Sequence, residues 1–82
     1  MQTYFAVDSD GVETCFNEKP FRNTKDGLNF WDLPKGRYND TNNVILPKGS
    51  IKRLIGRELT WEDDFVVIDF SIKDVDSYER SI

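Results

Sequence analysis

The chain has 82 residues, of which 38% are hydrophobic and 32% are charged, and its net charge at pH 7 is −4. A chain of this length forms one domain with a small core, and its apolar content excludes a disordered protein. The negative charge has the wrong sign for a protein that covers phosphate backbones with its whole surface. One cysteine and no histidine are present, which excludes an internal disulfide and histidine-based catalysis.

The sequence also bears on location and partners. No apolar segment near the first residue has the form of a signal peptide, and no uncharged apolar run is long enough to span a bilayer, so we expect a cytoplasmic protein without a membrane partner. Residues 1–57 carry nine basic and seven acidic side chains, whereas residues 58–82 carry two basic and eight acidic ones. Such an acidic segment is typical of a solvated surface or of a face that meets a basic partner.

The first predicted element is a β-hairpin over residues 3–17. Asp10-Gly11 is the dipeptide that favours a two-residue type I′ turn. With that turn, Phe5 lies opposite Phe16 and shares one apolar face with Val7 and Val12, while the other face is mixed.

Residues 18–42 lose this alternation and are rich in Gly, Pro, Asn and Asp, which predicts a long loop. The segment nevertheless contains six large apolar side chains: Phe21, Leu28, Phe30, Trp31, Leu33 and Tyr38. A loop with so many must pack against the sheet or against a partner. A brief helical turn or a short strand within residues 28–33 is the alternative.

Residues 43–70 predict a strand, a helix, a turn and a second strand. The run Val44-Ile45-Leu46 indicates a short buried strand that ends at Pro47. Ser50 is the expected N-cap of a short helix, and Gly56 is expected to end it.

The helix is expected to pack on the sheet through an apolar stripe, since Ile51, Leu54 and Ile55 follow helical spacing.

Thr60 and Asp63 favour a capped turn, with Trp61 folded back onto the helix or the sheet. The segment "FVVIDF" is apolar on both faces, which predicts a central strand. The tail, residues 71–82, extends that strand or frays.

No pattern of residues supports catalysis. Cys15 lacks a histidine partner and is expected to be a small structural hydrophobe. A calcium-binding loop that contained Asp8 and Asp10 would lack its first and last ligands. The segment "PKGS" lacks the upstream glycine of a phosphate-binding loop. We therefore expect no catalytic, cofactor or metal residues and no enzyme activity.

Aromatic and basic side chains are instead the candidate partner-binding residues. They are Phe30, Trp31 and Tyr38 from the predicted loop, and Lys52, Arg53 and Arg57 from the predicted helix. Aromatic and arginine side chains commonly anchor protein partners. The same combination of cations and aromatic rings also suits single-stranded nucleic acid, which is the alternative.

Two segments carry a resemblance. "TYFAVDSDGVETCFNEKP" and "LPKGSIKRLIGRELTWEDDFVVI", with a tryptophan between them, resemble small uncharacterised proteins of phages and mobile elements of gut bacteria. The resemblance covers about two-thirds of the chain and leaves out residues 22–41 and the end of the chain after Phe70. It implies a small accessory protein and brings no activity or site residues.

The sequence as a whole predicts an α+β domain with a mostly antiparallel sheet of about four strands and one short helix on one face. The favoured function is a non-enzymatic accessory protein that binds another protein, for example an inhibitor of a host or defence factor. A nucleic-acid-binding accessory factor is the alternative, and the sequence leaves open whether the chain forms a homo-oligomer.

Overall fold

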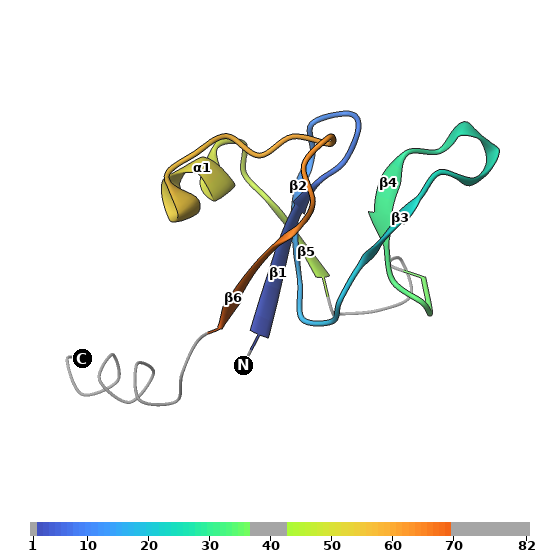
Figure 1. The fold of residues 1–82 in the computed structure, drawn as a ribbon, viewed down its shortest axis with the longest axis horizontal. Coiled ribbons are helices and arrows are strands. Elements are labelled where there is room, and N and C mark those ends of the chain that lie inside the picture. The colour runs from blue at the N-terminus through green and yellow to red at the C-terminus, as the bar shows by residue number, and fades with distance from the viewer. Residues whose placement is uncertain (1, 37–42, 70–82) are drawn as a thin grey trace.

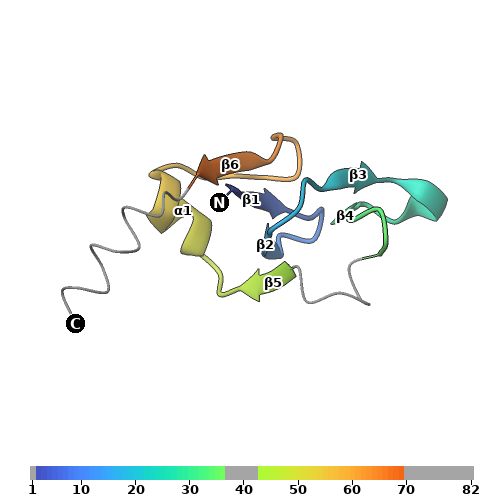
Figure 2. The ribbon, with the colours of Figure 1, turned by 90° about the horizontal axis from the view of Figure 1, so that it is seen from below.

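The fold is an antiparallel four-stranded sheet with a short helix on one face and a second hairpin on the other (Figure 1). The computed structural model describes residues 2–36 and 43–69. Within them the sheet order is β5-β2-β1-β6, with β5 and β6 at the two margins (Figure 2). This confirms the expected small α+β fold. The strands of the sheet are β1 (Gln2–Val7), β2 (Glu13–Phe16), β5 (Asn43–Leu46) and β6 (Val66–Asp69).

The first hairpin has a different register from the predicted one. Val7 pairs with Glu13, and the Asp8 N–H donates to the Val12 carbonyl at 3.0 Å, so the loop holds three residues, 9–11, and not two. The Gly11 N–H donates to the Asp8 carbonyl at 2.9 Å, and Gly11 has a φ of 88°, as in a type I turn followed by a glycine bulge. Because side chains alternate along a strand, this one-residue shift puts Phe5 and Phe16 on opposite faces.

The predicted loop contains a second hairpin, which corrects the sequence-based expectation. Strand β3 (Phe21–Asn23) pairs with β4 (Phe30–Asp32), and a short 3-10 turn, η1 (Lys25–Gly27), lies between them. Asp26 and Gly27 have positive φ, of 57° and 75°, which is the requirement of a type I′ turn. Tyr38 and the rest of residues 37–42 lie outside the described residues.

Helix α1 (Ser50–Ile55) packs on one face of the sheet through fewer residues than predicted. Ile51 is buried and Ile55 packs beside it, whereas Leu54 is 48% exposed. The helix ends as expected at Gly56, whose N–H donates to the Lys52 carbonyl at 2.8 Å. Among the described residues, no helix is long and apolar enough to cross a membrane.

Two predicted strands lie at the margins of the sheet and not inside it. Within the described residues β6 pairs only with β1, and Val67 is 43% exposed, so "FVVIDF" does not form a central strand. The predicted buried strand at Val44-Ile45-Leu46 is also a margin, since Val44 is 56% exposed and Ile45 65% exposed. The tail, residues 71–82, lies outside the described residues.

The sheet has a core on each face. The helix side buries Phe5, Val7, Ile51 and Leu59. The hairpin side buries Ala6, Phe16, Trp31 and Leu33, with Tyr4, Trp61 and Phe65 packed around them. The two central strands therefore contribute alternate residues to different cores, which explains why a small chain buries so much of β1.

Trp31 joins the second hairpin to the sheet. Its backbone N–H donates to the Asp8 carboxylate at 2.7 Å, and its indole N–H donates to the Val7 carbonyl at 3.0 Å. Its ring makes edge-to-face contacts with Trp61 and Phe65, with ring centroids 6.0 and 5.7 Å apart. The Arg22 guanidinium lies over the rings of both tryptophans, which adds a cation–π contribution.

We expect Trp31→Phe to lower the free energy of unfolding by about 2–4 kcal/mol, because it leaves a cavity and removes the donor from the Val7 carbonyl. Urea denaturation measures the loss. Trp61→Phe is the control, since Trp61 is only half-buried and should lose less. An equal loss in the two variants would show that Trp31 has no special role in joining the hairpin to the sheet.

Candidate functional site

Of the six predicted binding residues, Tyr38 lies outside the described residues, and the other five do not form one patch. Trp31 is 3% exposed and belongs to a core, so it is not available to a partner at the surface. Phe30 is half-buried on the hairpin side of the sheet. Lys52 and Arg53 lie on the other side of the sheet, because α1 packs on the face opposite the hairpin.

Of the three predicted basic residues, Lys52 and Arg53 lie on α1, whereas Arg57 follows its end. Lys52 forms an ion pair with Glu58 at 3.5 Å, and both side chains are more than half exposed. Arg53 and Arg57 are exposed as well. An exposed pair of this kind adds little stability, and these three cations stand apart from Phe30.

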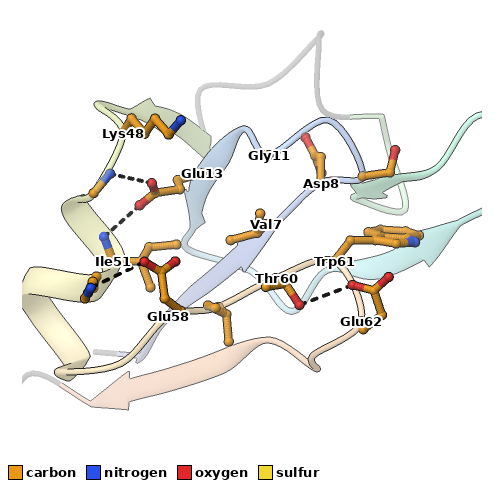
Figure 3. Close-up of a pocket in the computed structure, with 14 residues that line it drawn as sticks. Val7, Asp8, Gly11, Glu13, Lys48, Ile51, Glu58, Thr60, Trp61 and Glu62 are labelled. Atoms are coloured by element: carbon orange, nitrogen blue, oxygen red, sulfur yellow. Dashed lines mark hydrogen bonds and ion pairs between the residues drawn. The ribbon is translucent and has the colours of Figure 1, made fainter.

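A cleft of about 370 Å³ with a mixed polar and apolar lining lies between β2, the start of α1 and the segment that leads to β6 (Figure 3). We call it the helix cleft. Its lining combines carboxylates, lysines and a few apolar side chains: Asp8, Glu13, Glu58, Glu62, Lys48, Lys52, Val7, Ile51, Leu59 and Trp61 among them. Both charges line the cleft, and Glu58 is paired with Lys52, so the lining does not favour a ligand of one charge.

Glu13 has a structural role in this cleft. Its carboxylate accepts the N–H groups of Gly49 and Ile51, at 2.6 and 2.8 Å (Figure 3). Those amides belong to the start of α1, where N–H groups lack partners inside the helix. The predicted cap, Ser50, instead donates its hydroxyl to the Pro47 carbonyl at 2.6 Å. Glu13 therefore replaces Ser50 as the cap and ties α1 to β2.

The Thr60 turn at the other end of the helix cleft matches the predicted capped turn only in part, because the Thr60 hydroxyl donates to the Glu62 and Asp63 carboxylates instead of accepting an N–H. The Thr60 N–H donates to the Asp63 carboxylate at 2.9 Å, and the Asp63 N–H donates to the Thr60 carbonyl at 3.0 Å. Trp61 folds back onto the hairpin side of the sheet and not onto the helix. Glu62 and Asp63 are thus part of the turn that holds Trp61 in place.

A second, more apolar cleft of about 520 Å³ lies between the tips of the two hairpins and β5. We call it the hairpin cleft. Its wall includes Val12, Leu28, Phe30 and Ile45, together with the carboxylates of Asp8 and Asp10. Leu28 and Ile45 are 58% and 65% exposed, so the apolar wall continues outward to the margin of the sheet.

Strand β5 forms that margin, and its pairing shows which way its backbone points. The Asp8 N–H donates to the Val12 carbonyl, so even-numbered residues of β2 direct their backbone groups toward β1. Glu13 and Cys15 therefore face β5, where they pair with Leu46 and Val44. By alternation, the N–H and C=O of Ile45 point away from β2.

Among the residues of the hairpin cleft, only Phe30 was predicted from the sequence to bind a partner. Ile45 was expected in a buried strand and Leu28 in a loop. Pro47, directly after β5, was the available signal, because proline is confined to the ends and margins of sheets. The pattern of β5 itself is apolar throughout and does not distinguish a buried strand from an exposed one.

Cys15 is half-buried beside the helix-side core and lines neither cleft. Burial raises the pKa of its thiol, which lowers the fraction of reactive thiolate. Within residues 2–36 and 43–69, no group of three or more histidine, cysteine, aspartate or glutamate side chains is placed to hold a metal ion. The two clefts offer surfaces for binding.

No protein-family model matches the chain, and no curated protein or solved structure matches it either.

We expect Glu13→Ala to lower the free energy of unfolding by about 1–2 kcal/mol, because two helix amides lose their acceptor. Glu13→Gln should lose less, since its amide oxygen still accepts a hydrogen bond. Glu62→Ala is the control from the same cleft and should change stability by about 0.5 kcal/mol or less. A Glu13→Ala protein as stable as the parent would exclude the capping role.

We expect Cys15 to react slowly with iodoacetamide near neutral pH. Because its pKa is raised, the thiolate should form only at a higher pH than in an exposed cysteine, and the midpoint of the rate against pH should shift upward. The urea-unfolded chain is the control and should show the ordinary midpoint. Equal midpoints in the two states would contradict the effect of burial.

Proposed function

We propose that this chain is a non-enzymatic accessory protein that binds an extended segment of a partner protein along β5. The observation that carries the proposal is the exposure of Val44 and Ile45, 56% and 65%, on a strand at the margin of the sheet. Native proteins usually protect such strands with charges or with covering elements. Among the described residues, no strand pairs with the outer side of β5.

The backbone and the hairpin cleft would act together in this binding. In strand addition, main-chain hydrogen bonds supply affinity, and pockets for alternate side chains supply specificity. The outward N–H and C=O of Ile45 are available for main-chain hydrogen bonds. The hairpin cleft beside the same residue is the pocket for a side chain of the bound segment. The β6 margin is less suited, because its most exposed apolar side chain, Val67, lines neither cleft.

The remaining expectations from the sequence stay predictions. An origin in phages or mobile elements, a cytoplasmic location and an inhibitory role against a host or defence factor all need a partner to be identified. Nucleic-acid binding through Lys52, Arg53 and Arg57 has no specific observation in its favour. Gel-shift assays with single- and double-stranded oligonucleotides at two salt levels test it, since phosphate contacts give a steep salt dependence.

We expect panning of a displayed library of random dodecapeptides to select peptides that bind the intact chain, and Ile45→Pro to weaken their binding about tenfold or more. Proline removes an N–H that does not bond to β2, so the sheet should persist. Ile45→Ser, which keeps the N–H, should lose less. Fluorescence anisotropy of the selected peptides measures all three proteins.

Leu54→Ser is the matched control, because Leu54 is also an exposed apolar residue but lies on α1. It should bind the peptides like the parent chain. Amide exchange adds a direct test, since a bound peptide should slow exchange at Ile45 more than at Val44, which already faces β2. The proposal fails if no peptide is selected, or if Ile45→Pro binds as well as Leu54→Ser.

A further inference from the structure

The hairpin cleft lies on a defined side of any strand added to β5. Ile45 pairs with Thr14, and residues directly opposite in a sheet project to the same face. Thr14 is fully buried and lies on the hairpin face, because it pairs with Ala6 of the hairpin-side core. A residue placed beside Ile45 in an added strand therefore projects its side chain over the hairpin cleft.

The cleft offers two different surfaces to that side chain. Its apolar wall is formed by Ile45, Leu28 and Phe30. Its charged residues are Asp8 and Asp10, and within residues 2–36 and 43–69 no lysine or arginine lines it. The cleft thus differs from the helix cleft, whose lining includes Lys48 and Lys52.

The two carboxylates are held in place by the hairpin. Asp8 is 7% exposed and accepts the Trp31 N–H at 2.7 Å. The Asp10 Oδ1 accepts the Val12 N–H at 3.0 Å, while the side chain stays exposed. The exposed Asp10 carboxylate, which accepts this bond through Oδ1, retains lone pairs on Oδ2 that can accept another donor.

We infer that the bound segment presents a lysine or arginine beside Ile45, with its aliphatic stem on the apolar wall and its cationic end at Asp10. This inference rests on the proposed function. Long basic side chains lie in this way along apolar surfaces, with the charge at the polar end. A purely apolar side chain would gain the wall but would desolvate the exposed Asp10 carboxylate without giving it a donor. Charge complementarity thus favours a basic segment of a partner protein.

The test uses the peptides selected by panning on the intact chain. We expect lysine or arginine to be enriched at one fixed position with apolar residues around it. Replacing that residue by norleucine, which keeps the stem and removes the charge, should weaken binding about two- to fivefold at low salt, as expected for an exposed ion pair. The difference should shrink at high salt.

Asp10→Asn should cause the same loss, because asparagine keeps the Oδ1 acceptor for the Val12 N–H and removes only the charge. The norleucine peptide should then lose nothing further on this variant, as a double-mutant cycle requires. Asp64→Asn is the matched control: Asp64 also accepts a neighbouring N–H, that of Phe65 at 2.8 Å, and lines neither cleft. It should bind like the parent chain.

The outcomes separate the two proposals. If Ile45→Pro abolishes binding but Asp10→Asn behaves like Asp64→Asn, or no basic residue is enriched, the inference is overturned and the proposed function stands. If no peptide binds, both fail. Light scattering tests the other occupant: a chain that dimerises, with Ile45→Pro monomeric and no peptide bound, would assign the β5 margin to a second copy and overturn the inference.

Discussion

Trp31 fixes the position of the second hairpin with its backbone and its side chain at once. The backbone N–H reaches the Asp8 carboxylate, and the indole N–H reaches the Val7 carbonyl. Register explains the second bond: β6 pairs with β1 only as far as Phe5, so the Val7 carbonyl lies beyond the last paired residue. A buried carbonyl without a donor is costly, and the indole removes that cost while its ring covers the sheet.

This arrangement turns a small sheet into the middle layer of a three-layer structure. Phe5 and Val7 serve the helix side, while Ala6 between them serves the hairpin side. A chain of this size has few residues for a core, and a central strand buried on both faces uses most of them. The margins are then left with exposed apolar residues, Val44 and Ile45 at one and Val67 at the other. The hairpin cleft follows from the same geometry, because the second hairpin stands beside β5 without covering it.

Short sequence motifs predicted where helices, strands and turns occur better than they predicted which strands and side chains these elements contact. Gly56 ended the helix as expected, because a positive φ is a local requirement. Asp-Gly occurs at residues 10–11 and 26–27, yet only the second forms a type I′ turn, with positive φ at Asp26. The first is part of a three-residue loop, because that register lets Phe5 and Phe16 enter separate cores. The cap of α1 shows the same limit, since its acceptor, Glu13, comes from a strand far away in the sequence.

The hairpin cleft could not be predicted from the sequence for a related reason. Aromatic residues between polar ones suggest a binding loop, but the hairpin buries Trp31 and leaves Leu28 exposed. Exposure of β5 depends on the order of strands in the sheet, which apolar composition does not encode. Asp10 carries the same ambiguity, because its turn-forming role explains its presence without any ligand. What distinguishes a binding carboxylate from a turn-forming one is the apolar wall across the cleft, and that wall exists only once β5 and the second hairpin are side by side.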